Sequence, residues 1–124
     1  MRHITALFAL LVSIWIAGAA PLSAGTELVM IEEAGCMWCA RWNREIAPIY
    51  PKTAEGRAAP LRRASLRGDN SDMTLKTGIH FTPTFILTVD GVEHGRIEGY
   101  PGEAFFWGLL GRLIEEAPGK ASPG

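Results

Sequence analysis

Cys36 and Cys39 are the only cysteines among the 124 residues of the chain, and two residues separate them. Such a pair can form a structural disulfide, hold a metal ion or act as a redox couple. A disulfide across so short a loop removes little entropy from the unfolded chain, so it would stabilise the fold only weakly. A structural metal needs about four ligands, and His80 and His94 have no paired spacing with each other or with the cysteines. We therefore expect redox chemistry and no metal site, with both histidines as ordinary loop and strand residues.

The position of the two cysteines predicts different roles for them. A β-rich run, Thr26–Glu32, predicts a first strand, and a helical pattern runs from about residue 36 to residue 50. Cys36 would lie at the N-terminus of this helix, where free N–H groups and the helix dipole stabilise a thiolate. Cys39 would lie one turn later, on the buried face. Cys36 is thus the expected nucleophile, and Cys39 the sheltered thiol that resolves the intermediate.

The elements that position this pair can be predicted along the rest of the chain. The first helix should bury Trp42, Ile46 and Ile49 together with Cys39, and Pro48 should kink or end it. The other predicted elements are a second strand at 59–66, a loop and short helix at 68–78, two strands joined at Asp90-Gly91, and a last helix at 101–117 with Phe105, Leu109, Leu110 and Leu113 on its apolar face. The order β-α-β-α-β-β-α predicts an α/β fold with a mixed sheet and helices on both faces.

The N-terminal residues are typical of an export signal. Arg2 and His3 precede an uncharged stretch, Ile4–Ala20, and small residues follow it, so we expect a signal peptide at 1–24. An uncleaved membrane anchor is less favoured, because the stretch is shorter than the roughly 20 residues that span a bilayer. Residues 25–117 would then form one domain, and 118–124 a disordered tail. Export predicts a periplasmic location, where thiols tend to form disulfides.

The charge pattern of the exported part argues against nucleic acid as a partner. Removing Arg2 from the 12 basic residues leaves 11, against 13 acidic ones, and the two signs are well mixed. No basic stripe indicates a nucleic-acid surface, and no second apolar segment indicates a membrane domain.

A second diagnostic pair, Thr82-Pro83, stands directly before the predicted third strand. Proline cannot donate to a sheet ladder, so it belongs at the start of a strand or in a turn. Together with a Cys-x-x-Cys at a strand-to-helix junction about 45 residues earlier, it makes the chain resemble the thioredoxin superfamily. The matching segments are GCMWCARW, Thr82-Pro83, the Asp-Gly hairpin, the stretch GRIEGYPG and the last helix. They cover nearly all of the exported part, without the first strand and helix of full thioredoxin.

The resemblance implies several properties that the residues alone do not. It implies a thioredoxin-like fold, no cofactor, a redox-active disulfide between Cys36 and Cys39, and a cis Pro83 that lies against this disulfide. Thr82 would offer backbone hydrogen bonds to an extended client peptide. More narrowly, the chain looks like the SoxS-type periplasmic thioredoxins of bacterial sulfur oxidation. We therefore expect a monomer that acts on periplasmic protein thiols and disulfides, with a membrane thiol transporter as electron donor and a sulfur-carrier protein as client.

Some positions depart from the thioredoxin pattern and leave alternatives open. Met30 stands where thioredoxin has a buried acid. Glu32 or Glu33 could therefore accept the proton of the second thiol, or both could be solvated carboxylates at the end of a strand. Trp38, between the cysteines, is expected to contact partner proteins, although it could instead pack on the loop around Thr82.

The expected function is the reduction of disulfides or modified cysteines in partner proteins by a thiol–disulfide oxidoreductase. A periplasmic disulfide oxidase or isomerase is the nearest rival, since threonine before the cis-proline also occurs in the isomerases. A metal or copper delivery protein that uses the two thiolates is the rival from another class. A redox-inert binding module on the same fold is the third.

Overall fold

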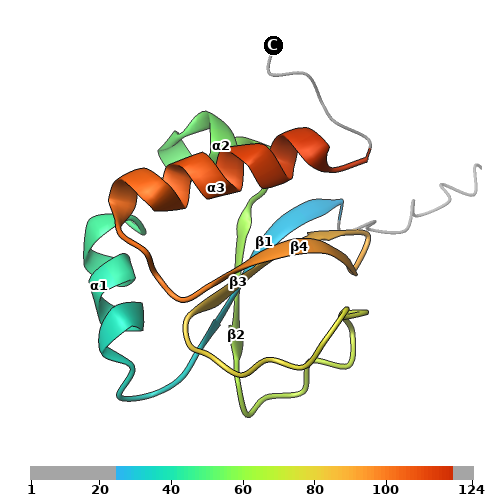
Figure 1. The fold of residues 1–124 in the computed structure, drawn as a ribbon, viewed down its shortest axis with the longest axis horizontal. Coiled ribbons are helices and arrows are strands. Elements are labelled where there is room, and N and C mark those ends of the chain that lie inside the picture. Colours follow the sequence, from blue (N-terminus) through green and yellow to red (C-terminus); the bar gives the residue numbers. More distant parts are fainter. Residues whose placement is uncertain (1–24, 119–124) are drawn as a thin grey trace, which may run out of the picture.

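The computed structural model describes residues 25–118, which form a four-stranded mixed sheet with helices packed on it (Figure 1). The strand order is β2-β1-β3-β4, with β1 and β2 parallel and the other neighbours antiparallel. The elements are β1 (Thr26–Glu32), α1 (Met37–Glu45), the 3-10 turn η1 (Tyr50–Lys52), α2 (Ala54–Ala58), β2 (Leu61–Ser65), β3 (Thr84–Val89), β4 (Val92–Glu98) and α3 (Glu103–Glu116). The predicted mixed α/β class is confirmed. The predicted signal peptide at 1–24 lies outside the described residues, as does the predicted tail at 118–124 except for Pro118.

Strand β1 is buried on both faces, which explains its continuous apolar run. Leu28 and Met30 point to the face that carries the helices, and Val29 and Ile31 point to the opposite face. All four side chains are completely buried. Successive strand residues alternate between the two faces of a sheet, so a strand in the middle of a two-faced core needs apolar residues at every position.

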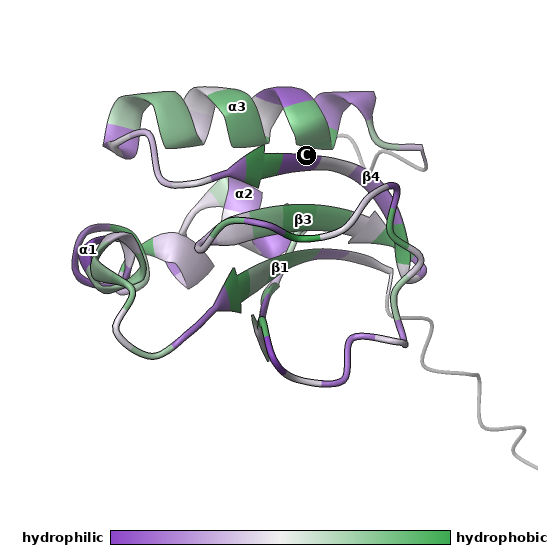
Figure 2. Ribbon diagram, turned by 60° about the horizontal axis from the view of Figure 1, so that its bottom comes forward, coloured by the Kyte–Doolittle hydropathy of each residue, from purple (hydrophilic) through white to green (hydrophobic). Residues whose placement is uncertain are grey.

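The helices pack on one face of the sheet, and α3 lies along it in Figure 2. Trp42 of α1, Phe85 of β3 and Phe106 of α3 meet in this core. The ring centroid of Phe85 lies 5.1 Å from that of Trp42 and 5.0 Å from that of Phe106. Aromatic pairs at such separations contribute about 0.5–1.5 kcal/mol each beyond their buried area. The aromatic cluster therefore fixes α1 and α3 against the strand that follows Pro83.

An irregular connection, residues 66–83, covers the opposite face. Apolar side chains of this connection pack on Val29, Ile31 and Ile86. These side chains are Leu66, Met73, Leu75 and Ile79. The predicted short helix at 68–78 is wrong, because the connection contains no helix. The expectation of helices on both faces is also wrong for the described part of the chain.

Hydrogen bonds to side chains and to the hairpin explain why the connection is not helical. The N–H of Ser71 donates to Oδ1 of Asp69 at 3.0 Å. The N–H of Thr74 donates to the carbonyl of Gly91 at 2.8 Å, and its carbonyl accepts from the N–H of Glu93 at 2.9 Å. Local bonds from Asp, Asn and Ser side chains compete with helical hydrogen bonds, and here the pairing with the hairpin competes as well.

Helix α1 ends at Glu45, earlier than the predicted residue 50. Pro48 lacks an N–H and its ring would clash with the preceding turn, so the helix closes before it. Ile49 consequently leaves the buried face and is 41% exposed, which corrects its predicted burial. The short α2 follows, although no helix was expected there. Thr53 caps it, since Thr53 Oγ1 accepts from the N–H of Gly56 at 3.0 Å.

The hairpin and the last helix were predicted more closely. Asp90 and Gly91 have φ angles of 50° and 79°, the left-handed values that a tight two-residue turn needs. In α3 the buried stripe is Phe106 and Leu110, and Phe105 and Leu109 are exposed. The prediction was thus right for Leu110 and wrong for Phe105 and Leu109. Both stripes are apolar, so the sequence pattern does not show which one is buried. Contact with the sheet buries the stripe of Phe106 and Leu110.

Candidate active site

The turn between β1 and α1 places the two cysteines at the start of the helix. Gly35 has a φ angle of 79°, which side chains rarely allow, and it turns the chain sharply after Glu33 and Ala34. The N–H of Cys36 donates to the carbonyl of Glu33 at 3.4 Å. Cys36 is the N-cap of α1, as the sequence predicted.

Cys36 and Cys39 form a disulfide with their Cα atoms 5.2 Å apart. The N–H of Cys39 donates to Sγ of Cys36 at 3.0 Å. The same free N–H groups at the start of a helix stabilise a thiolate at this position when the disulfide is reduced. Cys36 is partly exposed, whereas Cys39 is 2% exposed and belongs to the core on the helix face. The pair therefore has one accessible sulfur and one sheltered sulfur.

Thr82 and Pro83 lie beside this turn. The pairing of Ile31 with Thr84 in the antiparallel ladder brings the end of β1 next to the start of β3. Beyond it, Thr82 Oγ1 donates to Oε1 of Glu33 at 3.4 Å. The Thr82–Pro83 peptide bond is cis, and Pro83 is buried. Within residues 25–118, neither the N–H nor the carbonyl of Thr82 has a backbone hydrogen bond.

Exposed apolar side chains stand next to the cysteines and to Thr82 in the sequence. Met37 and Trp38 are 77% and 50% exposed, and Phe81 is 57% exposed. The guanidinium of Arg41 lies 5.6 Å from the ring centroid of Trp38, a cation–π distance. Sequence reasoning identified Trp38 but missed Phe81. Its position next to Thr82 was the available signal.

The two acids before the cysteines differ in their surroundings. Glu32 accepts from the guanidinium of Arg63 at 2.7 Å and from Nδ2 of Asn43 at 3.4 Å. Glu33 is exposed and is bonded by Thr82. Met30, at the position of the buried acid of thioredoxin, is completely buried. The structure thus pairs Glu32 with a cation and leaves Glu33 in solvent close to Cys36.

The predicted site residues come together, and His80 and His94 form no metal-binding group with them. No group of three or more His, Cys, Asp or Glu side chains within residues 25–118 is arranged to hold a metal ion. In the same part of the chain no helix is long and apolar enough to cross a membrane.

Comparison with known proteins gave one informative match. No protein-family model matches the chain, and no curated protein does. Among solved structures, the chain is similar to the crystal structure of the periplasmic thioredoxin SoxS from Paracoccus pantotrophus in its reduced form. The sequence identity is 53% and the TM-score is 0.70, over 73% of this chain and 96% of that chain. The chain belongs to the thioredoxin superfamily, within the SoxS type of this relative, and its Cys36–Cys39 pair makes it a thiol–disulfide oxidoreductase.

Proposed function

We propose that this protein is exported and reduces disulfides or modified cysteines of periplasmic partner proteins. The periplasmic thioredoxin to which it is similar and the signal-like residues 1–24 support the location. The proposed client is a sulfur-carrier protein with a reactive cysteine, and the proposed electron donor is a membrane thiol transporter. The protein acts as a monomer, without a cofactor.

The difference in exposure between the two cysteines is the observation that carries this proposal. Cys36 is partly exposed at the helix N-cap, and Cys39 is buried one turn further on. A nucleophile must reach the sulfur of another protein, and a resolving thiol must reach only its neighbour. Because thiolates attack and thiols do not, the helix N-terminus favours attack by Cys36.

The exchange balances without a further reactant. In the reduced protein, the Cys36 thiolate attacks one sulfur of the client disulfide, which breaks, and the released client thiolate takes up a proton. Cys39 then loses its proton and attacks Sγ of Cys36, and the second client sulfur leaves as a thiol. The client gains two electrons and two protons, and this protein gains the Cys36–Cys39 disulfide. Two electrons from another thiol protein restore the reduced form.

The surroundings of the disulfide suit an extended client segment. The backbone of Thr82, which no backbone group within residues 25–118 bonds, can accept and donate hydrogen bonds in the manner of an added strand. Trp38 is exposed beside Cys36 and supplies an aromatic anchor. Met37 and Phe81, next in sequence to Trp38 and Thr82, are further exposed apolar side chains. We assign Thr82, Pro83 and Trp38 to client binding.

A trapping experiment tests the assignment. The Cys39→Ser variant, once reduced, should hold a disulfide-containing client as a mixed disulfide through Cys36, because the resolving thiol is missing. The matched Cys36→Ser variant keeps only the buried thiol and should trap on the order of tenfold less, because only accessible thiolates exchange readily. Non-reducing electrophoresis and mass spectrometry identify the adducts. Equal trapping by the two variants would contradict the roles, and trapping by neither would contradict the proposed function.

A further inference from the structure

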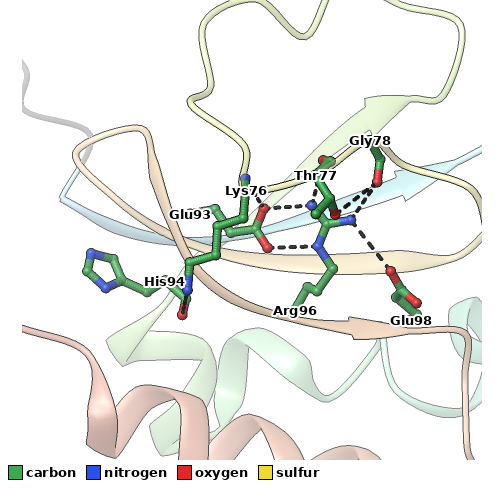
Figure 3. A network of polar contacts seen from close by, with 7 residues as sticks. All are labelled: Lys76, Thr77, Gly78, Glu93, His94, Arg96 and Glu98. Atoms are coloured by element: carbon green, nitrogen blue, oxygen red, sulfur yellow. Dashed lines mark hydrogen bonds and ion pairs between the residues drawn. The ribbon is translucent and has the colours of Figure 1, made fainter.

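Glu93 and Arg96 of β4 form a buried ion pair on the face of the sheet opposite the helices (Figure 3). Arg96 donates from Nε to Oε2 of Glu93 at 2.7 Å and from Nη2 to Oε1 at 2.6 Å. Glu93 is 3% exposed. These bonds lower the pKa of the Glu93 carboxyl, so the pair is charged at neutral pH. Burial of two charges costs desolvation that their attraction only about balances, so net stabilisation does not by itself explain the pair.

A β-bulge brings the two side chains together. Residues three apart in a regular strand point to opposite faces. Here the register shifts between Leu87 and Thr88, and His94 has no partner in the ladder. The additional residue reverses the alternation, so that Glu93 and Arg96 point to the same face. The bulge thus creates the pair at the place where the irregular connection passes over the sheet.

The pair forms its other hydrogen bonds with three successive residues of that connection. Arg96 donates from Nη1 to the carbonyl of Gly78 at 2.9 Å and from Nη2 to the carbonyl of Thr77 at 3.0 Å. Oε1 of Glu93 accepts from the N–H of Lys76 at 2.9 Å. Figure 3 shows these bonds converging on the guanidinium and the carboxylate. A side-chain pair therefore supplies partners to backbone groups that lie outside any helix or strand.

These bonds fix the chain just before Thr82-Pro83. Gly78 precedes Thr82 by four residues. On the other side of Thr82, the carbonyl of Pro83 accepts from the N–H of Gly99 at 2.7 Å, directly after β4. The stretch 79–82 is thus held at both ends by β4 and the residue that follows it. Within this stretch, Thr84 Oγ1 donates to the carbonyl of Phe81 at 2.6 Å, and Thr82 Oγ1 donates to Glu33 at 3.4 Å. No described backbone group bonds Thr82, so the two backbone anchors contribute to the placement of its peptide groups.

We propose that the Glu93–Arg96 pair is a positioning device for client recognition, which holds residues 76–78 so that the Thr82 backbone is presented beside the disulfide. This inference rests on the proposed function, because it assigns the pair to the binding of an extended protein client. Neither side chain touches the reacting sulfurs in this role. The pair should affect reactions that use the Thr82 backbone, and it should leave the intrinsic reactivity of the cysteines unchanged.

Two substrates separate positioning from a general structural role. An intrachain-disulfide peptide needs the Thr82 backbone, whereas a small disulfide such as bis(2-hydroxyethyl) disulfide does not. For Arg96→Met, we expect kcat/KM with the peptide to fall on the order of tenfold, since small misplacements of a binding group are costly. The rate with the small disulfide should stay within about twofold of wild type. Glu93→Gln, which keeps the shape of the side chain, should show the same split.

Arg96→Lys and Tyr50→Phe complete the experiment. Arg96→Lys keeps the charge but loses the planar fork, so it should show a smaller split and carries the test if Arg96→Met does not fold. Tyr50→Phe removes a buried hydrogen bond to the carbonyl of Ala59 at 2.6 Å, far along the chain from the connection. It should destabilise the protein without a split between substrates. Equal losses on both substrates, or no loss on either, in folded Arg96 variants would overturn the inference. Failure of the wild-type protein to reduce the peptide would instead overturn the proposed function on which it rests.

Discussion

At the scale of single residues, the two sulfurs differ because of where the helix begins. Sγ of Cys36 accepts a hydrogen bond from the N–H of Cys39 at 3.0 Å, and Cys39 is buried among core side chains. The surrounding charges oppose full stabilisation of a thiolate. Arg41 is engaged by Glu45 at 2.8 Å, and the exposed Glu33 lies close to Cys36. A negative charge near a thiol raises its pKa.

These charges predict a reducing couple. A weakly stabilised thiolate makes a couple less oxidising, so equilibrium titration against glutathione should give a potential closer to roughly −270 mV, as in thioredoxin, than to roughly −120 mV, as in the strong periplasmic oxidant. Glu33→Gln should shift the potential to more oxidising values. Glu115→Gln, at an exposed position on α3, is the charge-matched control and should not. A wild-type value near the oxidant's would refute reduction as the direction.

At the scale of elements, the segments before and after β2 are held in place in two different ways. Before β2, α1 ends at Glu45 ahead of Pro48, and η1 and α2 follow as separate short elements. The turn is so tight that a Cβ on Gly56 would meet the carbonyl oxygen of Tyr50 at 1.8 Å. After β2, the connection is held by Arg96 and Glu93 instead of its own backbone. The turn before β2 depends on near neighbours in sequence, whereas the connection after β2 depends on β4 residues distant in sequence.

Two glycine-to-alanine variants test this packing in opposite directions. Gly56→Ala should lower the free energy of unfolding by about 2 kcal/mol or more, because the backbone of Tyr50 must move. Gly108 lies in α3, and apart from the backbone of its own helix no atom lies within 4 Å of an added Cβ. Gly108→Ala should raise the free energy of unfolding by about 0.5–1 kcal/mol, because alanine favours a helix over glycine. Urea unfolding of both variants measures the difference. A neutral Gly56→Ala would show that the turn is looser than described.

At the scale of the whole molecule, one aromatic core ties the active-site helix to the rest of the protein. Trp42 and Phe106 join α1 and α3 through Phe85. Tyr50 extends this core toward α2, stacks on Trp107 with ring centroids 6.0 Å apart, and donates its hydroxyl proton to Ala59. Burial raises the pKa of the Tyr50 hydroxyl well above its ordinary value of 10.

The buried tyrosine predicts a loss of stability in alkali. In the unfolded chain Tyr50 releases its proton near pH 10, while in the folded protein it keeps it to higher pH. The stabilisation is therefore complete below about pH 10 and decreases as the pH rises, by at most about 1.4 kcal/mol per pH unit for this group. Denaturant unfolding between pH 8 and pH 11 measures the slope. Tyr50→Phe should flatten it, and an unchanged slope in that variant would contradict the assignment.

Features that depend on near neighbours in the chain could be predicted from the sequence. The Cys36–Cys39 spacing at a strand-to-helix junction indicated the redox chemistry. The turn at Asp90-Gly91 and the bounds of β1 followed from residue preferences and from an uninterrupted apolar run. The resemblance of Thr82-Pro83 to the thioredoxin pattern located the second part of the site. These signals are local because backbone dihedrals, caps and alternation act over a few residues.

Tertiary contacts select among several local structures that the sequence allows. Both apolar stripes of α3 suited burial, and the sheet selected the one with Phe106. Residues 68–78 could have formed a helix, but hydrogen bonds to the hairpin and the Glu93–Arg96 pair hold them in an irregular path. That pair could not be foreseen, because it exists only where the bulge at His94 reverses the alternation of β4. Such contacts join residues far apart in sequence, so their energies appear only when the sheet has formed.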